Sequence, residues 1–585
     1  MKVKFINNDK FLEITDVKTT ADVKLLENAA SAIPMYWKNK RQVKGDPICY
    51  VKSANFNKYM PAGLWNRLLK LQQAGHNIQF ENFMQQDTTI TKEWIDKFIE
   101  DLGALYTLAP HQLNAVYTAL RFRQTACAIG TSGGKTFIAF ALASILLRQH
   151  NYSPDKKYLV IVPSQLLCIQ GHSDFAEFMS TMDDPHLKVH MIFSGAKNTH
   201  KLAESNVVFA TYQSLSNMTM LDGFFDQFQY VYVDEAHRSV DAVKNIIKYM
   251  DHVVFRNAFS GSFPESHTVE MLNIETFIGP LLYEFKTAKL RDAGFTSDFA
   301  IVPVEIIHKA EDTRAYFTML KQKLDLQKEY NKMQPVFEYV AHQKAKIAQP
   351  GTLYPQTLDE MLKGIKDNSL KFIDQDSYQA LIVRSKELME LDAHKDINRR
   401  MLEEEYLFTA HNRHKVLAHL VGSLDKNTLI LSRRRNDVKG LYDAGVAYAP
   451  NKICHLIMGG ISNADKISSI NEVKEDEDFS RHAVYGNVDM IGTGTSIKSL
   501  FYALFAGIGK SPYTAIQTVG RMIRKFHAKT KSFVFDSFDT LECDVPGIPS
   551  AYKRSYSSAH ATARLQIFAA EDYEIMHDKK ITLRT

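Results

Sequence analysis

The sequence predicts an α/β protein built from two parallel-sheet domains in tandem, preceded by a small α+β domain and interrupted by a helical insertion. Short β-branched apolar runs alternate with longer helical segments from about residue 108, and the same alternation resumes near residue 427. Between the two blocks, roughly 310–415, the chain is charged, helical and poor in strand signals. Repeated strand–loop–helix units are typical of a parallel sheet covered by helices on both faces.

Each block supplies its own set of expected strands. In the first block these are the apolar runs at 158–162, 207–210, 230–233 and 257–260. In the second block they are the runs at 427–432, 453–457, 488–491, 500–506 and 533–536. We therefore expect domains over 1–100, 101–305 and 306–545, followed by a helical segment over 546–585.

The N-terminal domain is expected to hold a few strands and a helix that begins near Leu64. All three tryptophans lie in it, and Trp37 and Trp65 could either stack on bases or pack in a core. A basic stretch interleaved with aromatic residues surrounds Trp37. Its cations are typical of contacts with a nucleic-acid backbone, and those we single out are Lys38, Lys40 and Arg41.

The composition is that of an ordinary globular protein and excludes several other classes. A chain of 585 residues exceeds what one hydrophobic core supports. With 45% hydrophobic and 23% charged residues, long disorder and collagen-like repeats are excluded. The five cysteines are scattered without a C-x-x-C pair, which argues against a zinc ribbon or a disulfide scaffold. The net charge of +5 permits a polyanionic partner without requiring one.

The sequence contains no targeting or membrane signal. Its first residues, MKVKFINNDKFLEITD, lack the apolar segment of a signal peptide. No apolar run approaches the ~20 residues that are needed to span a bilayer. We therefore expect a cytoplasmic protein without a membrane partner.

The most informative stretch is IGTSGGKT at 129–136, which lies between an apolar run and a helical segment. Backbone N–H groups in such a Gly-rich loop can point at phosphate oxygens, and the helix N-terminus adds its positive dipole end. Lys135 would reach the β- and γ-phosphates and Thr136 would ligate Mg²⁺. The loop residues expected to cradle the nucleotide are Gly130, Thr131, Ser132, Gly133 and Gly134. The alternative is a tight turn before a helix, because Ile129 stands where the strict pattern has Gly.

A second element, VYVDEAH at 231–237, is an apolar strand that ends in two carboxylates. Parallel sheets present ligands at the carboxyl ends of their strands, so Asp234 would hold Mg²⁺ near the phosphate loop. Glu235 would orient and deprotonate an attacking water. The alternative is a strand followed by an acidic helix cap.

A third element, QTVGRMIR at 517–524, places Arg521 and Arg524 on one face of a helix, with Gln517 one turn before Arg521. Paired guanidinium groups can stabilise the charge on a transferring phosphoryl group. Gly520 lies within this helix, and we expect close packing at this position to explain why a glycine is present. Because the loop and the arginines lie on different blocks, we expect ATP and Mg²⁺ to bind between them. The alternative is a basic surface helix.

In this order, the three elements resemble the motifs of superfamily 2 helicases. Lesser motifs of that superfamily also match, at LAPHQ (108–112), VPSQLL (162–167), ATYQSL (210–215), FSGS (259–262), LILSRRR (429–435) and GTGTSIK (492–498). The resemblance implies two RecA-like domains, adenine reading by Gln112 and a nucleotide contact at Gly494. Gln517 stands where the RNA helicases usually carry His, so the resemblance is to the DNA-acting branch.

Several polar residues follow expected strand ends, where hydroxyl and N–H groups can hold DNA phosphates. These residues are Ser164, Thr211, Thr493 and Arg433. Each hydroxyl can equally serve an ordinary turn or helix cap, and the arginine can simply be solvated.

Within the superfamily, the chain resembles the phage recombination and branch-migration helicases, although its insertion is larger than we expect for them. This resemblance implies ATP-driven remodelling of forks, Holliday junctions, D-loops and R-loops, and annealing of strands. The implied partners are branched DNA, RNA in R-loops, and phage recombination or single-strand-binding proteins. Two alternatives stay open: an ATP-gated DNA-binding or annealing protein without strand separation, and a translocase of restriction-motor type.

Overall fold

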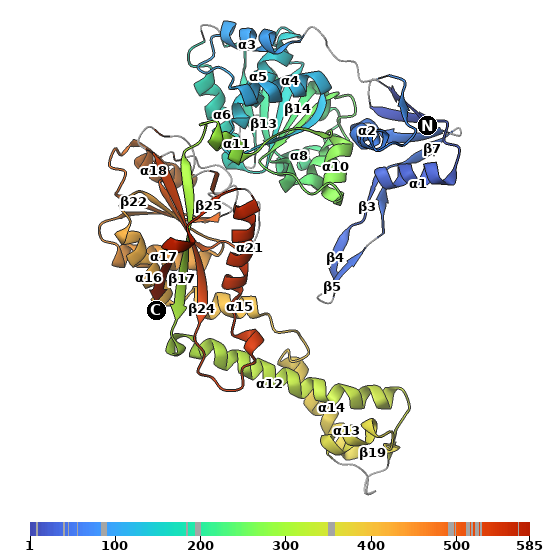
Figure 1. Ribbon diagram of the computed structural model, residues 1–585, viewed down its shortest axis with the longest axis vertical. Helices are drawn as coiled ribbons and strands as arrows, with labels where there is room; N and C mark the ends of the chain where they lie inside the picture. Colours follow the sequence, from blue (N-terminus) through green and yellow to red (C-terminus); the bar gives the residue numbers. More distant parts are fainter. Residues whose placement is uncertain are drawn as a thin grey trace.

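The computed structural model contains two sheet-based lobes in tandem, a small N-terminal domain beside the first lobe, and a helical arm on the second (Figure 1). It describes the chain except residues 8–9, 39–40, 45, 55–56, 83–89, 183–184, 194–199, 349–356, 489–496, 498, 510–514, 516–518, 521–525, 527–528 and 571. The side chains of 35–38, 41–43, 200–201 and 463–464 are also outside this description. Among the described residues, none of the helices combines the length and hydropathy that crossing a membrane would require.

The first lobe is a seven-stranded parallel sheet with helices on both faces. Its strands, in spatial order, are β12 (Val189–Ile192), β13 (Val207–Thr211), β11 (Lys157–Val162), β14 (Phe228–Asp234), β15 (Phe255–Ser260), β10 (Gln124–Ile129) and β16 (Leu281–Phe285). One face packs on α3 (Lys92–Asp101), α4 (Pro110–Phe122), α5 (Lys135–Arg148) and α6 (Gln165–Phe178). The other packs on α8 (Tyr212–Met218), α9 (Val240–Ile247) and α10 (Val269–Phe277). The short helices α7 (His200–Glu204) and α11 (Thr287–Asp292) complete the lobe.

The second lobe is an eight-stranded parallel sheet. Its strands are β21 (Ile453–Ile457), β22 (His482–Asn487), β20 (Thr428–Ser432), β23 (Tyr502–Gly507), β24 (Lys531–Leu541), β17 (Asp298–His308) and β25 (Glu574–Ile575), with β26 (Ile581–Arg584) also paired to β17. The sheet is covered by α16 (His411–Ser423) and α17 (Arg435–Tyr448) on one face, and by α18 (Asn463–Glu475) and α21 (Tyr556–Ala570) on the other.

The second sheet departs from the sequence-based expectation in three places. It takes in β17, which begins at Asp298, so this lobe starts before the expected boundary at 306. The strand expected at 488–491 is instead β22 at 482–487. This segment has a polar residue at each end, but β20 and β21 pair with it on its two sides and bury it. Val488 follows that strand in helical conformation, and 489–491 are not described. The C-terminal segment, expected to be helical, also contributes β25 and β26.

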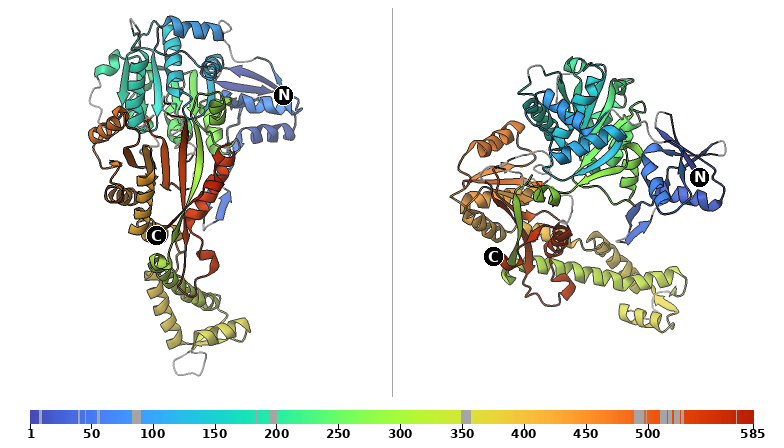
Figure 2. Two further views of the ribbon diagram at one scale, coloured as in Figure 1. Left: turned by 60° about the vertical axis from the view of Figure 1, so that its left-hand side comes forward. Right: turned by 45° about the horizontal axis from the view of Figure 1, so that its top comes forward.

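The insertion forms an arm that projects from the second lobe (Figures 1 and 2). Its helices are α12 (Ala310–Ala341), α13 (Leu358–Lys366), α14 (Gln375–Glu390) and α15 (Arg399–Glu403). Buried Met333, Met361 and Leu388 give the arm a core of its own. The arm is not purely helical, because β18 (Lys346–Ala348) and β19 (Phe372–Asp374) pair in parallel.

The N-terminal domain is an α+β module. Its sheet contains β7 (Lys52–Ala54), β8 (Asn57–Pro61), β2 (Phe11–Thr15), β1 (Lys2–Ile6) and β9 (Gln79–Phe80). Helices α1 (Thr20–Ala29) and α2 (Trp65–Gln73) pack on it, and β3 (Ser31–Ala32) pairs with β6 (Ile48–Cys49). A hairpin of β4 (Met35–Lys38) and β5 (Arg41–Lys44) extends away from the module (Figure 1).

Helix α2 docks this module on the first lobe. Trp65 is 5% exposed and stacks on Phe122 with ring centroids 6.0 Å apart. It therefore packs in a core, the second of the two roles expected for it. Arg67 forms an ion pair with the buried Glu275 of α10 and donates a hydrogen bond of 3.0 Å to the carbonyl of Ser266. A Cβ on Gly63 would lie 1.8 Å from the Glu275 carbonyl oxygen, so the two backbones touch there. The module is thus fixed to the sheet that carries the phosphate loop.

Candidate functional site

A cavity of about 940 Å³ lies between the two lobes. On the first-lobe side its lining includes the phosphate loop and both predicted carboxylates. On the second-lobe side it includes Ile467, Asn471 and Lys474 of α18, the helix that faces α6 in Figure 1. Sequence reasoning missed α18, because nothing in the sequence of a surface helix shows which lobe it will face.

The phosphate loop joins the end of β10 to the start of α5, as the Gly-rich pattern predicts. The Gly130 amide donates to the Phe285 carbonyl at 2.9 Å, and the Gly133 amide donates to the Gly130 carbonyl at 3.0 Å. Gly134 has φ +74°, and a Cβ there would lie 2.1 Å from Nε2 of Gln112. The loop therefore delivers Lys135 as the first residue of α5, where the helix dipole favours an anion.

Gln112, the expected adenine reader, lines the cavity and braces the loop. Its Oε1 accepts from the Ala109 amide at 2.9 Å, and its Nε2 donates to the Gly133 carbonyl at 3.2 Å. Nε2 of His111 lies 3.0 Å from the same carbonyl, and its ring stacks on Phe285. Burial lowers the pKa of His111, so the imidazole is neutral and can donate one hydrogen bond to the loop. Sequence reasoning overlooked His111, although it precedes Gln112 directly.

The two carboxylates lie at the carboxyl end of β14, on the edge of the sheet that carries the loop. Glu235 adopts a left-handed backbone, φ +49°, which turns the chain at the strand end. Its Oε1 lies 3.2 Å from Nζ of Lys135. Burial opposes ionisation of Glu235 and is the largest single effect, but Lys135, His237 and Arg238 together offset it and keep the pKa of Glu235 below its ordinary value. The pair therefore contains a carboxylate that can accept a proton.

A polar chain links Glu235 to the SGS segment. Nδ1 of His237 lies 2.7 Å from Oγ of Ser260, and that hydroxyl donates to the Ser262 carbonyl at 2.6 Å. Burial lowers the pKa of His237 to about 4, so the ring is neutral at pH 7. Because the Ser260 hydrogen is used on Ser262, Nδ1 of His237 must be the donor to Ser260. Movement of the SGS segment (260–262) would therefore change the contacts of Glu235, since Ser260 Oγ lies 3.4 Å from its Oε2.

The second lobe touches the phosphate loop through Gly520. Oγ of Ser132 donates to the Gly520 carbonyl at 2.6 Å, and a Cβ on Gly520 would lie 1.5 Å from Oγ1 of Thr131. This contact supplies the close packing that a glycine in QTVGRMIR required. Gln517, Arg521 and Arg524 of the same segment lie outside the described residues, as does Gly494.

The Gly520 contact gives a direct prediction. Substitution Gly520→Ala should force the second lobe away from the loop, because no side-chain rotation removes a clash at Cβ. A misplacement of about 1 Å at a reacting centre can cost roughly 10²-fold in rate. We expect a loss of that order in kcat/KM for nucleotide hydrolysis. The matched control is Gly422→Ala, whose Cβ would meet only Ala449 and Asn451 at 3.4 Å; equal activity of both variants would contradict the contact.

Comparison with known proteins agrees with these motifs. Residues 92–261 match the family model described as type III restriction enzyme, res subunit. The ATP-dependent DNA helicase uvsW of Enterobacteria phage T4 is 23% identical over 538 residues, which cover 89% of this chain and 88% of that protein. The chain resembles this superfamily 2 helicase. It is therefore an enzyme, as its motifs predict.

Two solved structures align with this chain at low identity. A crystal structure of T4 UvsW aligns over 100% of this chain and 99% of its own, with 18% identity and a TM-score of 0.39. The ATP-dependent Type ISP restriction-modification enzyme LlaBIII bound to DNA aligns over 82% of this chain and 31% of its own, with 12% identity and a TM-score of 0.47. The predicted fold class, two parallel-sheet domains in tandem, is confirmed by the two sheets of the structure itself.

The residues present suit Mg²⁺, the ion expected with ATP. The Thr136 hydroxyl and the Asp234 carboxylate both line the cavity beside Lys135, and hard oxygen donors are what Mg²⁺ prefers. Thr136 and Asp234 would hold the ion. When bound, Mg²⁺ neutralises charge on the phosphates.

The expected DNA-contacting residues fall into three groups. Ser164 and Thr211 cap helices α6 and α8, their hydroxyls accepting from the Leu167 and Ser214 amides at 3.3 Å. Arg433 is exposed at the end of β20. The other expected contacts involve atoms that the structure does not describe, namely residues Lys40 and Thr493 and the side chains of Lys38 and Arg41.

Proposed function

We propose that the protein is an ATP-dependent DNA helicase or translocase that remodels forks, Holliday junctions, D-loops and R-loops in phage recombination and replication, and that it anneals complementary strands. It would act inside the infected host cell. The observation that carries this proposal is the Lys135–Glu235 pair at the floor of a cavity whose opposite wall is the second lobe. A nucleotide bound there would touch both lobes, so its hydrolysis could change their spacing.

The chemistry assigned to each group follows from its position. Lys135 at the start of α5 would bind the β- and γ-phosphates, and Glu235 would take the proton of the attacking water. A phosphate that draws Lys135 away leaves Glu235 beside neutral His237, so the carboxylate becomes a stronger base as nucleotide binds. Arg521 and Arg524 would approach the γ-phosphate from the side of Gly520, and Gln517 and Gly494 would complete that wall.

On the DNA side, we infer contacts to the backbone rather than to base edges, since a motor requires grip without sequence reading. Arg433, Ser164 and Thr211 follow the carboxyl ends of strands in the two lobes and would hold phosphates with Thr493. The cations of the β4–β5 hairpin would extend this contact to the second arm of a junction.

The decisive experiment measures ATP hydrolysis with no DNA, with linear duplex and with a forked duplex, followed by strand displacement from the fork. The proposal requires hydrolysis that the fork stimulates and displacement that needs ATP. Annealing without any ATP-dependent displacement would instead identify an ATP-gated binding protein.

Partners on the phage side would be single-strand-binding or recombination proteins, and RNA would enter through R-loops.

A translocase of restriction-motor type is the second candidate, and the match of residues 92–261 to the res subunit favours it. Such a motor moves along duplex without separating strands. Displacement of a triplex-forming strand from linear duplex, without unwinding of a fork, would select this candidate.

The hairpin makes a separate prediction. The triple substitution of Lys38, Lys40 and Arg41 by alanine should weaken binding to a Holliday junction and lower the salt slope of log K by roughly 0.9 for each lost phosphate contact. ATP hydrolysis without DNA should be unchanged. The control is Lys18→Ala, an exposed cation on the same module but outside the hairpin. An unchanged slope in the triple variant would remove the hairpin from the DNA interface.

A further inference from the structure

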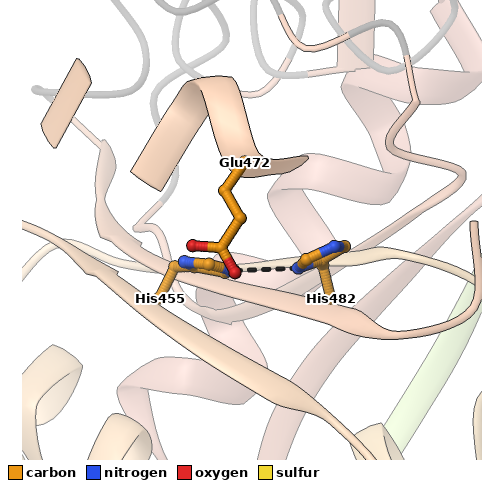
Figure 3. A group of neighbouring side chains, drawn as sticks. All are labelled: His455, Glu472 and His482. Carbon is orange, nitrogen blue, oxygen red and sulfur yellow. Dashed lines mark hydrogen bonds between the residues drawn. The ribbon is translucent and has the colours of Figure 1, made fainter. Parts of the chain in front are cut away.

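A cluster of metal-binding side chains lies in the second lobe, apart from the predicted magnesium ligands. His455 comes from β21, His482 from β22 and Glu472 from α18, and one ligand atom of each lies within 4.8 Å of the others. Figure 3 shows the Glu472 carboxylate turned towards the pair of imidazole rings. The three residues are distant in sequence, and the parallel pairing of β21 with β22 brings the two histidines together.

The two imidazoles are buried. His455 is 6% exposed and His482 is fully buried, and Nε2 of His455 lies 2.8 Å from Nδ1 of His482. Nε2 of His482 lies 3.0 Å from Oδ2 of Asp476, so this nitrogen carries the hydrogen and donates it to the carboxylate. Nδ1 of His482 is then left with its lone pair directed at His455 and Glu472.

This arrangement has the features of a transition-metal site. Two imidazole nitrogens and one carboxylate oxygen form a common set of protein ligands for Zn²⁺, with a water as the fourth. A histidine ligand usually donates its other N–H to a carboxylate, which fixes the ring, and Asp476 does this for His482. Tetrahedral ligands at 2.0–2.1 Å stand about 3.3 Å apart. The two nitrogens therefore need to separate by only about 0.5 Å.

A hydrogen-bonded histidine pair alone would account for the two buried rings. It would not account for Glu472, an exposed side chain on a third element that places a carboxylate oxygen within 4.8 Å of a nitrogen of each ring. Magnesium is a poor occupant, because it prefers oxygen ligands in octahedral geometry. The nitrogen-rich set selects a borderline first-row ion.

We propose that His455, Glu472 and His482 bind one Zn²⁺-class ion, with Asp476 orienting His482. The ion would join α18 to β21 and β22. Because α18 lines the cavity between the lobes through Asn471 and Lys474, which flank Glu472 in sequence, the ion would fix the second-lobe wall of that cavity. The role is structural and does not depend on nucleotide hydrolysis.

The test uses the full chain, stripped of metal by a chelator and kept free of nucleotide and Mg²⁺. Binding of Zn²⁺ is measured by equilibrium dialysis, and Co²⁺ reports geometry through its visible absorption. We expect one equivalent of Zn²⁺, a four-coordinate Co²⁺ spectrum and a higher Tm on loading. Glu472→Gln should weaken binding at least ~10-fold, and Asp476→Asn, which removes only the orienting carboxylate, by roughly 10- to 100-fold.

Glu475→Gln is the matched control, an exposed glutamate on the same helix that is not in the cluster. It should bind Zn²⁺ as the parent does. Glu472 is exposed, so its substitution should leave the fold intact, and an unchanged metal-free Tm confirms this. Absence of stoichiometric Zn²⁺ from the parent, or equal affinity of Glu472→Gln and Glu475→Gln, would overturn the proposal.

Discussion

Substitution Lys135→Ala is expected to lower kcat for ATP hydrolysis at least ~100-fold while leaving DNA binding without nucleotide intact. Lys135 begins α5 under a loop held by Gln112 and His111, so alanine removes one ammonium group without disturbing that support. Losing one preorganised charge at a site of developing negative charge typically costs 10²–10³ in rate.

The same substitution acts a second time through Glu235. Burial raises the pKa of that carboxyl and Lys135 is the main group that lowers it, so removing the lysine raises the pKa of Glu235. The base must be ionised to work. Residual hydrolysis by the variant should therefore increase with pH over a range where the rate of the parent is flat.

Hydrolysis is measured with saturating forked DNA, and the pH profile is recorded for both proteins. The control variant is Lys97→Ala, which removes an exposed ammonium group of the same lobe on α3. It should match the parent. A Lys135→Ala variant that retains half of the parental kcat would disprove the assignment of the phosphate loop.

The proximity of Lys135 and Glu235 was predictable because both follow strands of one parallel sheet, whose carboxyl ends share an edge. The groups that hold them were not predictable. The Tyr232 hydroxyl donates to the Lys135 carbonyl at 3.0 Å, a contact between residues 97 apart in sequence. Such contacts depend on the three-dimensional packing of side chains, which periodicity does not encode.

The order of the domains could likewise be predicted, whereas the assignment of each strand to one of the two sheets could not. Strand β17 follows the first block in sequence but pairs with β24 of the second sheet, a pairing between distant segments that local patterns do not encode. The ion pair between Arg67 and Glu275 joins the N-terminal domain to the first lobe. The sequence around neither residue indicates this contact. Helix α18 ends in the acidic run at 475–478, where Asp476 orients the buried His482, a contact that the charge pattern does not indicate.

Substitution Glu235→Gln is expected to preserve ATP binding and to lower turnover roughly 10²- to 10⁴-fold, the usual contribution of a general base. The amide has the size of the carboxylate and can still contact Lys135 and Ser260, but it cannot accept a proton from water. The left-handed turn at this residue depends on the backbone, so it should persist in the variant.

Turnover is measured at saturating ATP, and ATP affinity is measured separately by displacement of a fluorescent nucleotide. The variant should trap ATP and hold the DNA affinity of the ATP-bound protein, since hydrolysis no longer resets the lobes. The control is Glu284→Gln, an exposed glutamate at the end of β16 on the same lobe. If Glu235→Gln turns over at the parental rate, another group activates the water. The polar contacts that link Glu235 to Ser260 of the SGS segment would then serve only to position the loop.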